Sequence, residues 1–216
     1  MKADVIVVGG GPAGIITALT AKSVYPEKTV CLVKEIGDGV IPCAIPYMMH
    51  TLSDPEQNAM GNMPLEKAGI KIIIGKIVSL DAQAHMVKVA SGKRLSYERL
   101  VLATGTEPVL PPIPGIDKEG VFAIRKSMSA MKMLRDEAHK AKKVAVIGGG
   151  FIGAEFADEL CKNPDVEIDL IEMMPQLLFA AFDEEFGDEI SRILVSAGIT
   201  VHFGNRVASI NGKQHV

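Results

Sequence analysis

The sequence predicts an α/β protein with two Rossmann-like, three-layer domains, and both domains are expected to be incomplete. First, a short apolar strand at 5–8 runs into a glycine-rich turn, an apolar helical stretch and a second strand candidate. Second, the same order returns at 143–172. Third, 48% of the 216 residues are hydrophobic, which suits parallel sheets buried on both faces. A strand–glycine turn–helix–strand unit of about 30 residues is the context of a dinucleotide-binding fingerprint.

The first glycine turn has the GxGxxG spacing of such a fingerprint. Gly9 allows the tight turn out of the strand, Gly11 leaves room for a pyrophosphate against the backbone, and Gly14 lets the helix lie close to the strand. Pro12 and Ala13 complete the loop, at the start of the helix. The free N–H groups and the positive dipole end of that helix would face the phosphates.

A ribose-binding carboxylate is expected about 20 residues after the glycines, at the end of the second strand. Here the strand at 30–33 runs into Lys34 and Glu35. Glu35 is the nearest candidate, one position later than expected. Lys34 and Glu35 are equally well explained as a surface charge pair, and both interpretations stay open at this point.

The loop 36–46 is dense in glycine and proline and carries Cys43. Pro46 is suited to the first turn of a helix, which we expect to begin there. A cysteine just ahead of a helix start lies in a positive local field that favours the thiolate. The alternative is that Cys43 is a small buried hydrophobic residue, as free cysteines often are. Tyr47 either orients a substrate or simply packs.

Composition and charge exclude several other classes of function. The net charge of −3 gives no indication of a nucleic-acid partner or an anionic membrane surface. No apolar run reaches the roughly 18 residues of a membrane span, and the N-terminal residues do not resemble a signal peptide. Cys31 and Cys161, which lie in a strand and a helix, are expected to be structural. With Cys43 they form no metal-ligand spacing, so no metal and a reducing, cytoplasmic location are expected.

The middle of the chain reads as short strands followed by a proline-rich linker. Leu100–Ala103 is an apolar strand that ends at Thr104 and Gly105, and prolines crowd residues 108–114. We place the domain boundary there, with domains at 1–108 and 109–216. Shorter strands are expected at 71–75, 76–80, 85–89 and 94–95.

The second fingerprint is cleaner than the first. Gly148, Gly150 and Gly153 repeat the spacing, with Phe151 and Ile152 between them, and a helix is expected at 151–161. Glu172 ends the following strand, where a ribose-binding carboxylate belongs. A carboxylate there favours NAD(H) over NADP(H), and no Arg or Lys occurs in the next four positions. Further elements are expected at 127–142, 183–197, 199–203 and 206–210.

Four stretches together resemble the pyridine nucleotide–disulfide oxidoreductase family: VVGGGPAG, PCAIPY at 42–47, YERLVLATGTEP at 97–108 and VAVIGGGFIGAEFADEL at 144–160. The resemblance implies that the first domain binds FAD and the second NAD(P)H. It also implies that Thr104 and Gly105 lie near the FAD, and that Glu155 faces the nicotinamide end of NAD(P)H.

Cys43, the one cysteine in its loop, indicates which branch of this family the chain resembles. Met48 stands five residues after Cys43, so the CxxxxC of the dithiol branch is absent. The pattern is similar to coenzyme A disulfide reductases, persulfide reductases, and related NADH oxidases and peroxidases. Pro12 stands where the oxidase and peroxidase members usually carry a histidine, which favours a small thiol, disulfide or persulfide substrate. The implied mechanism passes hydride from NADH to the flavin and two electrons to a mixed disulfide at Cys43.

Family members continue well beyond 216 residues, with a Gly-Asp strand near the flavin and a dimerisation domain. We therefore expect this chain to be an N-terminal half, and a full-length form to be a homodimer. Two alternatives stay open. One is an electron-transfer reductase for a ferredoxin-like or rubredoxin-like partner, with Cys43 a bystander. The other is a nucleotide-binding piece without activity.

Overall fold

The computed structural model describes residues 1–212, which form two compact units. The first unit comprises Met1–Pro42, Ala59–Glu107 and Lys126–Met128. The second comprises Cys43–Asn58, Pro108–Arg125 and the residues from Ser129 onward. Both units interleave in sequence, because residues 43–58 leave the first unit and join the second.

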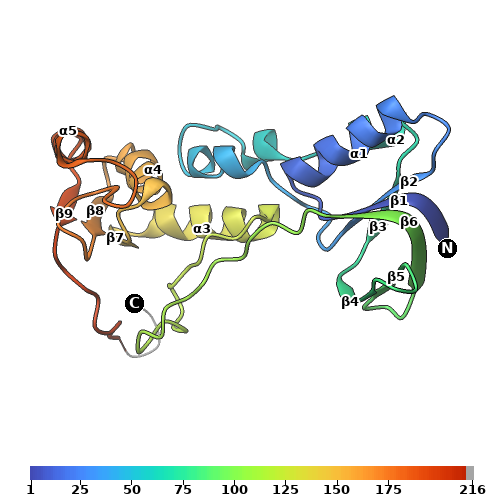
Figure 1. Cartoon of the computed structure of the whole chain (residues 1–216). Coiled ribbons are helices and arrows are strands. Elements are labelled where there is room, and N and C mark those ends of the chain that lie inside the picture. Colours follow the sequence, from blue (N-terminus) through green and yellow to red (C-terminus); the bar gives the residue numbers. More distant parts are fainter. Residues whose placement is uncertain (213–216) are drawn as a thin grey trace. The chain divides into compact units, whose positions relative to one another are not determined.

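The first unit is built on a six-stranded sheet in the order β3-β2-β1-β6-β5-β4 (Figure 1). The four neighbouring strands β3, β2, β1 and β6 run parallel to one another, and β5 pairs antiparallel with both β6 and β4. The strands are β1 (Lys2–Val8), β2 (Val30–Lys34), β3 (Lys71–Ile74), β4 (Ile77–Asp81), β5 (Met86–Val89) and β6 (Arg94–Leu102). Strand β6 is continuous where two short strands were expected, because it pairs with β5 at its start and with β1 along the rest.

Three layers form around this sheet, as the sequence predicted. Helix α1 (Pro12–Val24) packs on β1 and β2, and α2 (Met63–Lys67) packs on β3 and contacts α1. The core on the helix side contains Val7, Ala18 and Leu32. The opposite face of the parallel strands packs against the antiparallel strands, with Ile6, Val33 and Leu95 in one cluster.

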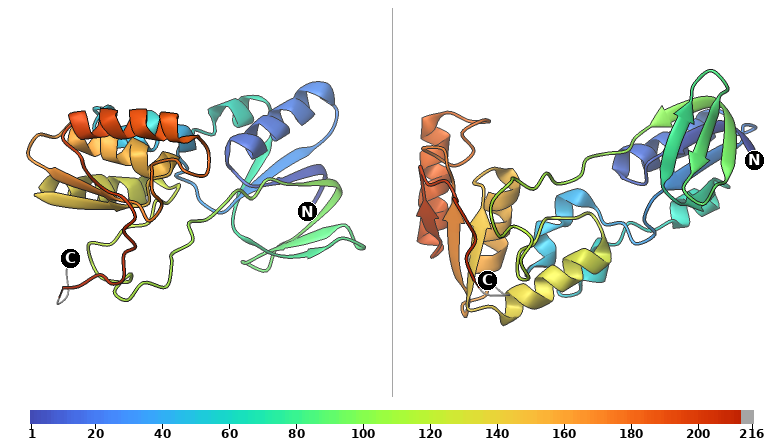
Figure 2. Two further views of the ribbon diagram at one scale, coloured as in Figure 1. Left: turned by 60° about the vertical axis from the view of Figure 1, so that its left-hand side comes forward. Right: turned by 90° about the horizontal axis from the view of Figure 1, so that it is seen from below.

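The second unit contains a parallel three-stranded sheet in the order β7-β8-β9, with β7 (Lys143–Ile147), β8 (Glu167–Ile171) and β9 (Thr200–His202). Helix α4 (Phe151–Cys161) packs on β7 and β8, and α5 (Glu184–Ser196) packs on β9 and contacts α4 (Figure 2). Helix α3 (Met128–Lys140) precedes β7. The fold class is therefore the predicted α/β class with mainly parallel strands.

Two expected elements of the second unit differ from the prediction. Residues 206–210 form no strand, although Ile210 N–H donates to Pro114 O at 2.8 Å. Residues 42–58 form only three 3₁₀ turns, η1 (Pro42–Ala44), η2 (Pro46–Met48) and η3 (Pro55–Asn58), where a helix was expected from Pro46. Among residues 1–212, no helix combines the length and apolarity that crossing a membrane requires.

Candidate functional site: two glycine cradles and a cysteine segment

The first glycine cradle joins β1 to α1 with backbone in close contact. Gly9 has φ +122°, and a Cβ there would lie 1.9 Å from Ala103 O, just after β6. A Cβ on Gly14 would lie 2.0 Å from Gly9 O. Gly11 is the N-cap of α1, and a Cβ built on it meets no atom within 4 Å. Gly9 and Gly14 are therefore required by the fold, whereas Gly11 leaves space for a ligand. Pro12 and Ala13 are exposed beside that space.

The second cradle, between β7 and α4, repeats this arrangement. Gly148 has φ +104°, and a Cβ on Gly153 would lie 1.8 Å from Gly148 O. Gly150 is the N-cap of α4 and again has no atom within 4 Å of its added Cβ. Phe151 and Ile152, the first residues of α4, are exposed. Both cradles present free helix N–H groups toward open space, which fits the pyrophosphate of a dinucleotide.

Glu172 lies beside the second cradle, at the end of β8. Its Oε2 accepts a hydrogen bond from Gly149 N–H at 2.6 Å, and its Oε1 accepts one from Met174 N–H at 2.7 Å. These two bonds fix the carboxylate next to the glycine turn. A carboxylate held there is suited to ribose hydroxyls and opposes a ribose 2′-phosphate.

In the first cradle, Lys34 occupies the position that Glu172 has in the second. The sheet registers are equivalent, because Val8 pairs with Val33 and Ile147 pairs with Ile171, so that Lys34 and Glu172 each come next along the chain. A Cβ on Gly10 would lie 2.6 Å from the Cβ of Lys34, just as a Cβ on Gly149 would lie 3.0 Å from that of Glu172.

The ammonium of Lys34 is engaged within its own unit. Its Nζ donates to Asn62 Oδ1 at 2.8 Å and to Gly37 O at 3.3 Å, and burial lowers the pKa of Lys34. Glu35 is exposed and pairs with Lys76 at 3.1 Å. The structure thus gives Glu35 the surface pairing that the sequence left open, although with Lys76 rather than with Lys34. The place of Glu172 is thus taken by Lys34, the last residue of β2, and not by an acidic side chain.

Cys43 is the exposed cysteine of the chain and lies in η1. The helix expected from Pro46 is replaced by the short 3₁₀ turn η2. The following bonds are of the i→i−3 type, from Met48 N–H to Ile45 O and from Met49 N–H to Pro46 O. A three-residue 3₁₀ turn carries no macrodipole of the kind invoked from the sequence, so exposure is the property that makes Cys43 available.

The other two cysteines lie in less reactive surroundings. Burial raises the pKa of the Cys31 thiol in β2 to about 11. Burial first, and then the neighbouring Asp158 carboxylate, raises the pKa of Cys161 at the end of α4. Both thiols are therefore poorer sources of thiolate than ordinary cysteines.

Three further expected positions lie near the cradles: Thr104 and Gly105 follow Ala103, whose carbonyl approaches Gly9, and Glu155 follows Gly153 on α4. Thr104 and Gly105 follow β6 and are exposed, and Gly105 has φ +72°. The Nζ of Lys126 donates to Thr106 O at 2.9 Å and to its hydroxyl at 2.8 Å, which holds this loop. Glu155 is exposed on the second turn of α4, where its carboxylate is free to meet a ligand.

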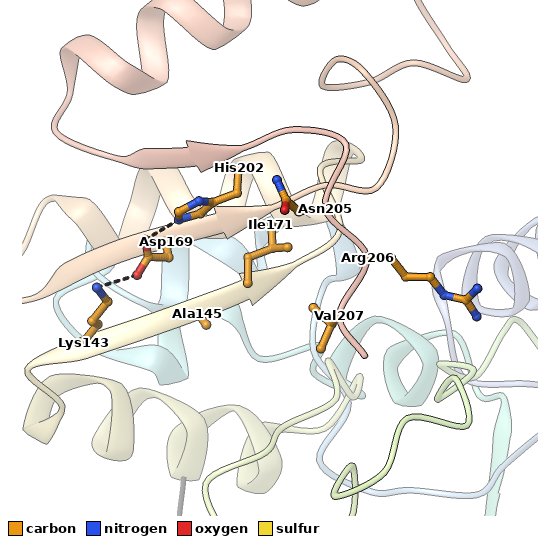
Figure 3. A pocket seen from close by; sticks show the side chains of 8 residues that line it. All are labelled: Lys143, Ala145, Asp169, Ile171, His202, Asn205, Arg206 and Val207. Atoms are coloured by element: carbon orange, nitrogen blue, oxygen red, sulfur yellow. Dashed lines mark hydrogen bonds and ion pairs between the residues drawn. The ribbon is translucent and has the colours of Figure 1, made fainter. Parts of the chain in front are cut away.

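The described part of the second unit also has an open pocket of about 440 Å³ on its sheet (Figure 3). Figure 3 shows Asp169 between Lys143 and His202. Its Oδ2 lies 2.8 Å from Lys143 Nζ, and its Oδ1 lies 2.7 Å from His202 Nε2. Val146 lies beside Gly153 of α4, so by alternation along β7 the pocket residues Lys143 and Ala145 lie on the face away from that helix. None of the residues predicted as site residues lines this pocket.

Sequence reasoning missed one buried carboxylate, Glu159 on α4, which is 1% exposed. Its signal was present in the pattern, since Phe156 and Leu160 of the same helix are core residues and Glu159 lies next to them. A carboxylate among core positions indicates a specific set of partners. In residues 1–212, no group of His, Cys, Asp and Glu side chains could hold a metal ion.

Comparison with known proteins places these features in a wider group. The pyridine nucleotide-disulphide oxidoreductase family model matches residues 3–216. An NADH oxidase of Methanocaldococcus jannaschii is 32% identical over 98% of this chain and 49% of its own length. An NAD(P)H coenzyme A polysulfide/persulfide reductase of Pyrococcus horikoshii is 32% identical over 100% of this chain and 49% of its own.

Solved structures show the same relationship. The NAD-dependent persulfide reductase of A. fulgidus superposes with a TM-score of 0.88 at 28% identity, covering 99% of this chain and 42% of that one. The chain spans about half the length of the curated relatives it matches. The family match over nearly the whole sequence, together with the two cradles, shows that the chain belongs to the pyridine nucleotide-disulphide oxidoreductase family.

Proposed function

We propose that this chain is the nucleotide-binding part of an FAD-dependent NADH oxidoreductase that reduces a small disulfide or persulfide through Cys43. The observation that carries the proposal is the exposure of Cys43 in a chain whose other thiols are shielded and have raised pKa values. The relatives from P. horikoshii and A. fulgidus, which are named as persulfide reductases, support the substrate class.

The cofactors are FAD at the first cradle and NAD(H) at the second. The open space at Gly11 and Gly150 fits a pyrophosphate in both cases, and Glu172 fits an unphosphorylated ribose. Thr104 and Gly105 belong to the FAD site, and Phe151, Ile152 and Glu155 to the NAD(H) site. The first cradle has Lys34 in the place of Glu172, and the Lys34 ammonium is bound to Asn62 and Gly37, so the ribose contacts there fall to backbone groups.

Cys43 performs the nucleophilic step in this proposal. Its thiolate attacks one sulfur of a disulfide RSSR, forms a mixed disulfide Cys43–S–SR and releases RS⁻. When bound, FAD would supply two electrons taken as hydride from NADH, and the mixed disulfide would then be cleaved to the Cys43 thiolate and a second RS⁻. The sum is NADH + H⁺ + RSSR → NAD⁺ + 2 RSH. With a persulfide RSSH, the products are RSH and H₂S.

The nucleophilic step can be tested on the 216-residue chain without turnover. Coenzyme A disulfide should add one coenzyme A mass to the wild type, and peptide mapping should place the adduct on Cys43. Cys43→Ser should abolish the adduct, whereas Cys31→Ser and Cys161→Ser should retain it. An adduct that survives Cys43→Ser would refute the proposal. NADH-dependent transfer to a ferredoxin-like acceptor that survives Cys43→Ser would favour the electron-transfer alternative instead.

A further inference from the structure

Glu159 is a buried carboxylate that plays no part in either glycine cradle. Its Oε2 accepts a hydrogen bond from Thr51 N–H at 3.0 Å, and its Oε1 accepts one from the Thr51 hydroxyl at 2.9 Å. Lys162 Nζ lies 2.5 Å from Oε1. A buried carboxylate is tolerated when its oxygens are satisfied in this way, so the contact with Thr51 is specific.

Thr51 belongs to the segment that carries Cys43. Residues 43–58 fold with the second unit, and η2 of this segment contacts α4. Further side chains hold the segment by its backbone. His139 Nε2 donates to Met49 O at 2.8 Å, and Arg135 of the same helix, α3, donates to Leu52 O at 3.2 Å. Glu159 thus completes a set of anchors around residues 49–52.

Helix α4 carries both Glu159 and the second glycine cradle. Its first turn forms the second glycine cradle, with Gly150 as N-cap, and Glu159 lies near its other end. Eight residues separate Phe151 from Glu159, which is about 12 Å along the axis of one helix. One rigid element therefore connects the cradle that fits NADH with the segment that bears the thiol.

We propose that Glu159 is a positioning residue, which holds Thr51 on α4 and thereby fixes the Cys43-bearing segment to the NADH-binding unit. The relevance of this to catalysis rests on the proposed function of Cys43. The anchoring itself concerns folding and thiol access, and it is measurable whether or not Cys43 reduces a substrate.

Three variants distinguish loss of the contact between Glu159 and Thr51 from a general loss of stability. Glu159→Gln keeps the shape but cannot accept both bonds from Thr51, and Thr51→Val removes the hydroxyl donor. Thr51→Ser restores that hydroxyl and is the conservative rescue. Glu189→Gln is the matched control, because Glu189 pairs with Arg192 on the exposed face of α5 and does not contact the segment.

The experiment measures amide hydrogen exchange of the peptides covering 45–53 and the alkylation rate of Cys43. Glu159→Gln and Thr51→Val should each speed exchange in 45–53 by about fivefold, the factor for one lost hydrogen bond, and should change the Cys43 rate. The double variant should go little beyond either single variant. Thr51→Ser and Glu189→Gln should match the wild type.

Unchanged exchange in 45–53 in both Glu159→Gln and Thr51→Val would overturn the proposal. It would also be overturned if exchange rose equally throughout the second unit, since that would show a loss of stability rather than of anchoring. The outcome is independent of the coenzyme A adduct test, because an anchored segment with an unreactive Cys43 would refute the proposed function alone.

Discussion

Glu172 Oε2 and Gly149 N–H form a hydrogen bond of 2.6 Å, which ties the carboxylate after β8 to the glycine turn that follows β7. The same turn in the first unit has Lys34 over Gly10. Two copies of one glycine motif thus carry opposite charges at the residue beside the middle glycine of the turn. We expect the nucleotide preferences of the two cradles to differ for this reason.

The second cradle should prefer NADH to NADPH. A 2′-phosphate would have to lie against the Glu172 carboxylate, which should weaken affinity by roughly 10- to 100-fold. Fluorescence titration of both nucleotides on the 216-residue chain measures this ratio. Glu172→Gln should narrow it, and Glu35→Gln should leave it unchanged. Equal affinities in the wild type would contradict this prediction.

Substitutions at two glycines of the second cradle should have opposite consequences. Gly153→Ala places a Cβ 1.8 Å from Gly148 O, so the turn must move and the free energy of unfolding should fall by several kcal/mol, ~3 or more. Gly150→Ala meets no atom within 4 Å and should change stability by less than about 0.5 kcal/mol.

Gly150→Ala should weaken nucleotide binding although it leaves stability nearly unchanged. Its added methyl group enters the space that fits the pyrophosphate, so NADH affinity should fall while the melting temperature stays near that of the wild type. Thermal unfolding combined with NADH titration checks both variants. A Gly150→Ala protein that binds NADH normally would show that the pyrophosphate lies elsewhere.

Cys43 should be the first thiol to react with iodoacetamide. Burial raises the pKa of Cys31 to about 11, and the pKa of Cys161 is also raised, so both hold little thiolate at pH 7 to 8, roughly the range where ordinary cysteines begin to react. Timed alkylation followed by peptide mapping gives the order. Labelling of Cys31 or Cys161 ahead of Cys43 would count against the prediction.

Acid should destabilise the second unit through Asp169. The hydrogen bond from Lys143, and then that with His202, hold the pKa of Asp169 below its ordinary value of 3.8. A depressed carboxyl pKa stabilises the fold above the unfolded-state pKa, and this contribution is lost as the pH falls through the folded-state pKa. Asp169→Asn should therefore lower the free energy of unfolding at pH 6. Below about pH 4 this free energy should fall less steeply in the variant than in the wild type, by roughly the contribution of one group. Urea unfolding at several pH values gives the two profiles, and identical acid slopes would exclude this role.

The fold was predictable because its signals are local. Glycine spacing and apolar strands reflect backbone requirements that act within a few residues, such as the close approach of Gly14 to Gly9 O. The helix expected at Pro46 was wrong, because the N–H groups of Met48 and Met49 close i→i−3 bonds there and the turn ends as a short 3₁₀ element.

The candidate site was less predictable where it depends on distant residues. That Lys34, the last residue of β2, takes the place equivalent to Glu172 follows from sheet register, and a shift of one residue decides between it and Glu35. The partner of Glu159 lies 108 residues away in sequence, and no pattern around either residue indicates the other.

The separation of 108 residues between Thr51 and Glu159 also means that the two residues are synthesised several seconds apart, at about 5–20 residues per second. At that rate roughly 5 to 20 s pass between the synthesis of Thr51 and that of its partner. During that interval the segment with Cys43 has left the ribosome without the helices that later hold it. During that time Cys43 would lie on a segment that is not yet anchored, so its position relative to the rest of the chain would be set only after α4 has been made.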